Sequence, residues 1–216
     1  MVQYSYYTAK PEKMKDFFIK ISKKGDIFMS KLQFNAPVIL GVFFISLVSL
    51  ALGVFTGGAS TSALFSVYRS SLASPLTYIR FVGHIFGHAN AAHFFNNMLL
   101  LLVVGPPLEK IYGSQTIAIG ILITAVVTGI IQFVFFPGSA LLGASGIVFM
   151  LIMLSSLTGA KNGQIPVTLI LVALMYLGQE VYSIVFIKDN VANLTHIIGG
   201  VCGIVMGFAL SGKNPV

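Results

Sequence analysis

The chain has 216 residues, of which 56% are hydrophobic and only 9% are charged, and its mean hydropathy is +0.91. Soluble domains carry about 25% charged residues, so this chain has too few polar side chains to cover a soluble surface, and a membrane protein is predicted. The net charge of +7 would suit nucleic acid, but seven of the 13 basic residues fall before residue 36. That placement is typical of a cytoplasmic segment against anionic lipid, so we expect a lipid bilayer and no nucleic acid as partner.

Six apolar runs follow the basic segment, and each is compared with the roughly 20 residues that a helix needs to cross a bilayer. They cover about 36–56, 91–108, 115–136, 145–157, 166–187 and 192–210. The first run is too long for the core of a signal peptide and is interpreted as a retained span. Basic residues concentrate in the connections that share a side with the N-terminus, which predicts that both termini are cytoplasmic.

These patterns predict an all-α membrane protein with six transmembrane helices. Its expected parts are a basic cytoplasmic segment over 1–35, a six-span domain over 36–211 and a short cytoplasmic tail over 212–216. A short N-terminal segment implies no large accessory domain at that end.

Two segments depart from plain spans. The connection over 57–90 mixes apolar side chains with Arg69 and Arg80, a composition that suits an outer loop lying in the membrane interface. The fourth run is short, because about 13 residues at 1.5 Å each give roughly 20 Å, less than the hydrocarbon thickness. We expect its start to lie below the outer surface, where non-helical backbone requires surrounding protein or a water-filled cavity.

Ser145 begins this short run, within Gly143-Ala144-Ser145-Gly146. Serine is a preferred helix N-cap, and a lone Gly-x-Ser-Gly taken alone favours that structural role. A helix N-terminus also offers free backbone N–H groups that can stabilise an oxyanion, so the position is compatible with a catalytic nucleophile.

The four histidines all lie outside the predicted cytoplasmic segments, and they are His84, His88, His93 and His196. His196 shares a helix face with Gly199. Gly199, Gly203 and Gly207 form a small-xxx-small ridge that lets helices pack closely in a bilayer. If the neighbouring helix is the fourth, His196 meets Ser145, and its imidazole could take the hydroxyl proton and return it to a leaving amine.

His93 and Asn97 are one helical turn apart, so both could donate hydrogen bonds to a developing oxyanion. The alternative is a polar contact between spans. Phe149 is one turn after Ser145 and could pack against the ring of His196 or simply fill the core.

No acidic residue is well placed to complete a triad. Glu109 lies at the predicted cytoplasmic end of the second span, and Glu180 lies near the predicted outer end of the fifth. A Ser–His dyad without an orienting carboxylate is therefore predicted.

In order and spacing, these residues resemble the rhomboid family of intramembrane serine proteases. The resemblance runs over about 80–207 and rests on His84, His88, His93 and Asn97, then Gly143-Ala144-Ser145-Gly146, then His196, Gly199 and Gly203. It implies that Ser145 is the nucleophile, His196 the general base, and His93 and Asn97 the side chains that complete an oxyanion hole. It implies supporting roles for Gly143, Phe149, Gly199, Arg80, His84, His88 and Glu109.

The chain also departs from the family pattern at three places. Ile79 stands where the family commonly has tryptophan, Phe149 stands where tyrosine is frequent, and Leu101-Leu102-Val103 lacks the aromatic residues often found there. These departures concern the anchoring of the first outer loop and the rate, and none of them removes a catalytic group.

The family implies single-span membrane proteins as substrates, cut near the outer end of their transmembrane helix and usually after a small residue. It implies that the fifth helix and the loop after the fourth part for substrate access, and that no cofactor is needed. The six-span form suggests a prokaryotic protein of the plasma or inner membrane. The sequence carries no indication of oligomeric state.

Two other functions fit parts of this pattern. A divalent-metal transporter could use His84 and His88, whose spacing suits chelation. No carboxylate or thiolate joins this pair, and the single cysteine, Cys202, lies in an apolar run, so no metal site is expected. An inactive relative that only binds membrane helices would normally lack the nucleophile or the base, and here both are present.

Overall fold

The computed structural model describes residues 15, 33–158, 164–178, 181–182 and 190–210. The chain divides into two units, Met1–Asn35 and Ala36–Val216, and every helix described below belongs to the second. Almost all of the predicted basic segment, the predicted tail over 212–216 and Glu180 lie outside the described residues.

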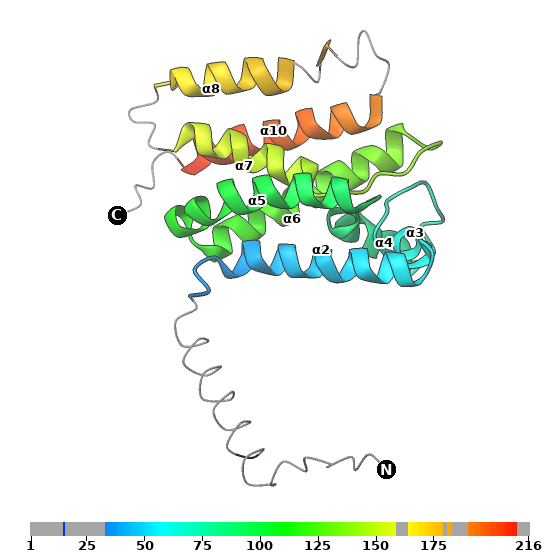
Figure 1. Ribbon diagram of the computed structural model, residues 1–216. Coiled ribbons are helices and arrows are strands. Elements are labelled where there is room, and N and C mark those ends of the chain that lie inside the picture. Colours follow the sequence, from blue (N-terminus) through cyan, green and yellow to red (C-terminus); the bar gives the residue numbers. More distant parts are fainter. Residues whose placement is uncertain (1–14, 16–32, 159–163, 179–180, 183–189, 211–216) are drawn as a thin grey trace, which may run out of the picture. The chain divides into compact units, whose positions relative to one another are not determined.

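The second unit is a helical bundle (Figure 1). Its longer helices are α2 (Pro37–Phe55), α5 (Ala91–Tyr112), α6 (Ser114–Phe135) and α10 (Asn190–Leu210). Its shorter ones are α7 (Ser145–Leu157) and α8 (Val167–Val172), which continues as a π-helical turn, η2 (Ala173–Leu177). The described residues contain no strand, only one isolated β-bridge between Val67 and Leu141. The predicted all-α membrane fold is confirmed.

Each of the six predicted runs contains a helix, but not every helix has the length of a span. Four are long and apolar enough to cross a membrane, namely α2, α5, α6 and the Asn193–Leu210 part of α10. Because α7 and the α8–η2 pair are shorter, six crossings stay a prediction.

The end of α5 differs from the prediction. It continues to Tyr112, past the expected end at 108, although Pro106 and Pro107 lie inside it. The helix stops at Gly113, which has a φ of 82° and donates its N–H to the carbonyl of Glu109. Glycine tolerates this left-handed region because it has no β-carbon.

The side chain of Glu109 explains why the extra turn is ordered. Its carboxylate accepts the backbone N–H groups of Val38 and Ile39 at 3.0 and 2.9 Å, and the Ser114 hydroxyl at 2.7 Å. The first N–H groups of a helix have no intrahelical acceptor. Glu109 is buried and thus caps α2 from a neighbouring helix.

Helix α7 lies in the interior of the bundle. It packs most extensively against α10 and also contacts α5, α6 and α8. Most of its residues are buried, as expected for a helix that is apolar on all sides. Ser145 therefore begins a helix that is enclosed by its neighbours.

Glycines bring α10 against α7. A β-carbon on Gly199 would overlap the carbonyl oxygen of Gly146, and one on Gly203 would overlap the carbonyl oxygen of Met150. The glycine ridge predicted from the sequence therefore packs on α7, with Gly199 and Gly203 against backbone and Gly207 against the Leu157 side chain.

The connection between α2 and α5 contains α3 (Ala59–Leu64), α4 (Pro75–Gly83) and the 3-10 turn η1 (His84–Phe86). On α4, Tyr78 and Ile79 are more than half exposed, whereas Arg80 is buried. This two-sided character fits the predicted interfacial loop. We call the end of the bundle that holds α3, α4 and the start of α7 the Ser145 end (Figure 1).

Candidate active site

Ser145 is the first residue of α7, and Ala144 is its N-cap. The Ala144 carbonyl accepts the first helical hydrogen bond, from Val148 at 2.9 Å. The N–H groups of the first turn, starting with Ser145, have no acceptor within the helix. They form a partial positive charge at the point where the Ser145 hydroxyl lies.

Gly143, two residues earlier, has a φ of 123° and lies against two polar side chains of α5. A β-carbon there would stand 2.8 Å from His93 Nε2 and 3.5 Å from Asn97 Nδ2. The Gly143 N–H donates to the His84 carbonyl at 2.9 Å. Glycine is thus required both by conformation and by space, and His93 and Asn97 are brought to the start of α7.

The tautomer of His93 follows from its contacts. The Ala89 N–H donates to His93 Nδ1 at 3.5 Å, and Asn90 Oδ1 accepts the backbone N–H of His93 at 2.9 Å as the N-cap of α5. Because Nδ1 is an acceptor, the neutral ring carries its proton on Nε2, which lies on the side of the ring that faces Gly143. Asn97 Nδ2 is buried and has no hydrogen-bond partner within the described part of the chain. Both side chains therefore present donors at one place.

His196 reaches the same region from α10. Its ring stacks on Phe149, with centroids 4.4 Å apart and planes 7° apart. Thr195 also contacts this helix start, since its Cγ2 lies 3.3 Å from the position of a β-carbon on Gly146. Phe149 is one turn after Ser145, so the imidazole lies along the face of α7 that carries Ser145.

His84 connects α6 with the loop that precedes α7. It is buried, its Nε2 donates to the Ala125 carbonyl at 3.1 Å, and its own carbonyl holds Gly143. Burial lowers the pKa of His84 to about 3, because a charge there would lose its hydration. The ring is therefore neutral at physiological pH. His84 links α6 to the loop before α7 through its hydrogen bonds to Ala125 and Gly143.

His88 lies next to His93, with ring centroids 5.1 Å apart. Its Nδ1 donates to the Phe86 carbonyl at 3.2 Å, and its Nε2 is buried without a hydrogen-bond partner among the described residues. Burial, and then the nearby His93, lower the pKa of His88 to about 4, although the hydrogen bond to Phe86 partly opposes this. His88 is therefore neutral as well.

Arg80 is tied to the connection between α2 and α5. Its Nε donates to the Ala63 carbonyl at 2.9 Å, and its guanidinium lies 4.4 Å from the centre of the Tyr68 ring. Arg80 and Glu109 are therefore structural in their contacts. They lie in separate parts of the bundle, the first in α4 and the second near the start of α2.

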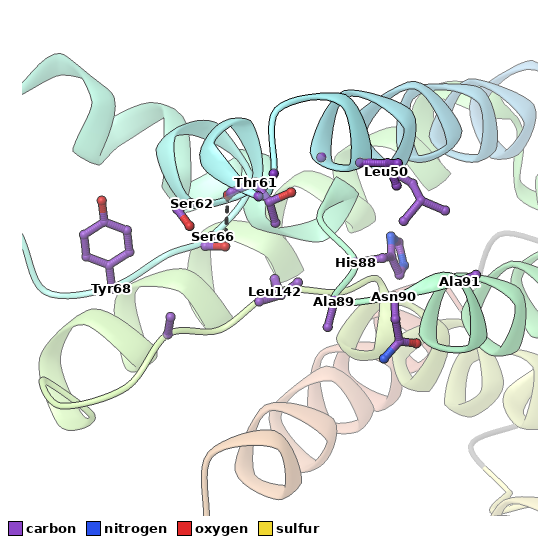
Figure 2. A pocket seen from close by; sticks show the side chains of 15 residues that line it. Leu50, Thr61, Ser62, Ser66, Tyr68, His88, Ala89, Asn90, Ala91 and Leu142 are labelled. Carbon is purple, nitrogen blue, oxygen red and sulfur yellow. Dashed lines mark hydrogen bonds between the residues drawn. The ribbon is translucent and has the colours of Figure 1, made fainter.

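A cavity of about 710 Å³ lies at the Ser145 end, between the end of α2, the connection after it and the loop before α7 (Figure 2). Its lining includes Thr61, Ser62, Ser66, Tyr68, His88, Asn90 and Leu142. Hydroxyl, amide and imidazole groups thus face a space that adjoins the segment leading to Gly143.

Several polar residues in α6 were not singled out from the sequence. Thr128 contacts His84 at 3.5 Å and bonds its own helix, and Gln132 donates to the Ser139 carbonyl and hydroxyl at 3.1 and 3.0 Å. Thr124, Thr128 and Gln132 recur every four residues, and all three are buried. This spacing within an apolar run was the available signal, because intramembrane polar groups usually face the bundle interior.

Tyr176 on η2 was missed as well, and it meets Phe149 edge-on at 5.8 Å. As for metals, no three His, Cys, Asp or Glu side chains gather in the described ranges. The nitrogens of His84 and His88 that bond Ala125 and Phe86 face backbone carbonyls.

Comparisons with known proteins identify the family of the chain. Residues 75–213 match the rhomboid domain family. The chain is 26% identical to mouse rhomboid-related protein 2 over 196 residues, which covers 81% of this chain and 65% of that protein. It is 27% identical to rhomboid protease GlpG of Serratia proteamaculans over 190 residues, covering 86% and 67% of the two chains.

A third relative is rhomboid-related protein 1 of Caenorhabditis elegans, 30% identical over 141 residues, which cover 61% of this chain and 39% of that protein. The chain therefore spans between 39% and 67% of the length of these three relatives. The matched family and the apolar helices together make the chain a multi-pass membrane protein.

Proposed function

The chain belongs to the rhomboid family, and from this premise we propose that it is an intramembrane serine endopeptidase with Ser145 as nucleophile and His196 as general base. The observation that carries the proposal is the convergence of three helices near the start of α7. The first turn of α7, the His93–Asn97 face of α5 and the imidazole on α10 meet around Gly143 and Phe149.

In the proposed reaction, the Ser145 hydroxyl attacks the carbonyl carbon of a peptide bond while His196 accepts its proton. When the tetrahedral intermediate collapses, the C–N bond breaks and His196 gives that proton to the leaving amine. Water then attacks the acyl-enzyme with His196 again as base, which releases the new carboxyl end and restores Ser145. The stacked ring of Phe149 favours the imidazolium that forms in each step, because a cation is attracted to an aromatic face.

The negative charge on the substrate oxygen would be bound by three donors. These are the backbone N–H of Ser145 at the start of α7, His93 Nε2–H and Asn97 Nδ2–H. Donors that are fixed in place before the reaction stabilise the developing charge without reorganising. The unpaired, buried amide of Asn97 supports this role, since a buried donor normally finds a partner.

A Ser–His dyad is consistent with the position of the acidic side chain that the structure describes. Among the described residues Glu109 is the one acidic side chain, and its carboxylate binds the start of α2. We therefore propose that His196 works without an orienting carboxylate, with Phe149 holding its ring.

The proposed substrates are single-span membrane proteins, cut near the outer end of their transmembrane segment. The proposed hydrolysis needs water near the buried start of α7, and the cavity at the Ser145 end, with Ser66, His88 and Asn90 in its largely apolar lining, can supply it. We further propose that the Ser145 end faces outward and both termini face the cytoplasm, in the plasma or inner membrane. In this arrangement 1–35 is a basic cytoplasmic segment, 36–211 the catalytic domain and 212–216 a tail.

The test is cleavage of a single-span reporter by the purified chain in liposomes. Wild type should cleave, while Ser145→Ala and His196→Ala should lose nearly all activity. Ser155→Ala is the matched control, because Ser155 is an exposed serine on the same helix and should leave cleavage unchanged. A fluorophosphonate probe should label wild type and not Ser145→Ala. Cleavage that persists in Ser145→Ala would overturn the mechanism.

A further inference from the structure

A row of three aromatic rings connects η2 to His196. Tyr176 meets the Phe149 ring edge-on, with centroids 5.8 Å apart and planes 84° apart. Phe149 in turn stacks on His196 at 4.4 Å and 7°. The 5.8 Å spacing lies within the range in which aromatic pairs attract each other and the 4.4 Å spacing lies at its lower edge, so the orientation of Phe149 depends on contacts with both neighbours.

Two residues of the turn that carries Tyr176 face away from the bundle. Leu174 and Met175 are 66% and 69% exposed, whereas Tyr176 is 37% exposed. The next residue, Leu177, lies against α10, with its Cδ2 2.8 Å from the position of a β-carbon on Gly200. Tyr176 and Leu177 thus connect η2 to its neighbours: Tyr176 contacts α7, and Leu177 contacts α10.

The backbone changes at this point. The chain is α-helical over Val167–Val172 and π-helical over Ala173–Leu177. π-helical turns are rare and frequently occur at functional sites. Here the π-helical turn contains both Tyr176 and Leu177, so the change in backbone geometry coincides with the contact to Phe149.

We infer that Tyr176 is a positioning residue for proton transfer: it holds the Phe149 ring against His196, so that the base is aligned when η2 is docked on α7. This inference rests on the proposed function. Without the Tyr176 ring, Phe149 gains rotamer freedom and His196 loses its fixed neighbour. Small displacements of a catalytic group reduce the chemical step more than they reduce binding.

The test compares kcat and KM of the full chain in liposomes, with a single-span reporter, across four substitutions. Tyr176→Ala and Tyr176→Leu should each lower kcat about fivefold, the loss expected from removing one aromatic contact, with little change in KM. Tyr176→Phe keeps the ring and should restore kcat. Leu174→Ala removes an exposed side chain from the same turn and should match wild type. Tyr176→Leu keeps an apolar side chain of similar bulk, so it remains informative if Tyr176→Ala does not fold.

A second readout is the rate at which a fluorophosphonate labels Ser145, because a small probe needs the nucleophile and the base but no transmembrane substrate. Labelling should slow in Tyr176→Leu and recover in Tyr176→Phe. Unchanged kcat and labelling in Tyr176→Leu, or an effect on KM alone, would overturn the positioning role. Cleavage by Ser145→Ala would instead overturn the proposed function, so the two failures are distinct.

Discussion

Gly199 of α10 lies directly against the carbonyl oxygen of Gly146 in α7, with no room for a β-carbon between them. Gly146 follows Ser145 in the chain, and Gly199 comes about one turn after His196. The contact therefore sets how closely the two helices approach at the level of the proposed dyad. This close contact between two glycines thus contributes to the spacing of the proposed nucleophile and base.

Replacing Gly199 with alanine should separate these helices. The added β-carbon meets backbone, which cannot rotate away, so α10 must shift. We expect Gly199→Ala to lower kcat by about 10²-fold and to destabilise the fold by about 1–3 kcal/mol. Reporter cleavage and thermal unfolding in detergent measure the two effects. Gly41→Ala is the matched control, because a β-carbon at Gly41 would have nothing within 4 Å. Full activity in Gly199→Ala would show that the spacing is not critical.

Asn97→Ala should reduce catalysis while leaving the fold intact. Removing one donor of an oxyanion hole lowers kcat by about 10²–10³-fold, and KM should change little because the charge exists only in the transition state. Asn96→Ala serves as control, since Asn96 is the adjacent, exposed residue of α5. If Asn97 only joined helices, its loss would lower the unfolding temperature and leave kcat near the wild-type value.

The double variant His93→Ala, Asn97→Ala tests whether the two side chains act on one oxyanion. Groups that stabilise the same charge are not additive, so the double variant should lose less than the product of the two single losses. Independent losses that multiply would indicate separate roles. The measurement is kcat for each single variant and the double variant with the same reporter.

Local sequence rules predicted the extent of α7 well. The apolar run starts after the small residues that end at Ala144, and its helix spans Ser145–Leu157 as expected. The same rules place the end of α5 at about 108, four residues before the observed end at Tyr112, although both limits lie past Pro106 and Pro107. The helix continues since Glu109, beyond the prolines, is fixed by the backbone of α2. Such a contact between helices is not visible in a local pattern.

The same distinction applies to the site. Spacing alone shows that His93 and Asn97 share a face, because four residues make about one turn. It does not show that this face meets Gly143, which depends on how α5 packs against the loop before α7. Tyr176 illustrates the limit further, since its contact with Phe149 joins two helices that no motif connects.

Glu109→Ala should destabilise the protein without touching the chemistry. The substitution leaves the N–H groups of Val38 and Ile39 without their acceptor, and at least one of these is buried. An unsatisfied buried donor costs about 1–3 kcal/mol, so we expect a clearly lower unfolding temperature in detergent. At low temperature, kcat should stay near wild type, because Glu109 binds α2 and not the dyad. A loss of kcat without a loss of stability would contradict the structural role.

Acid should destabilise the protein through His84 and His88, which lie in the connection outside the candidate spans. Burial lowers their pKa values to about 3 and about 4, against 6.5 in the unfolded chain. Between these values the unfolded chain binds more protons than the folded one, so stability rises with pH. The contribution is complete above pH 6.5 and is lost as the pH falls through the folded values. Unfolding temperatures should therefore be level from about pH 8 to 7 and fall steadily below about pH 6.

His84→Asn separates this effect from general acid sensitivity. The variant removes the group with the lower pKa, and it also weakens the bond from His84 to the Ala125 carbonyl. We expect a lower unfolding temperature at neutral pH but a shallower decline in acid, because one proton fewer is taken up on unfolding. Thermal unfolding in detergent at a fixed heating rate gives both slopes. An equal slope in the two proteins would mean that His84 titrates in the folded state as it does in the unfolded chain, and that its burial does not keep it neutral.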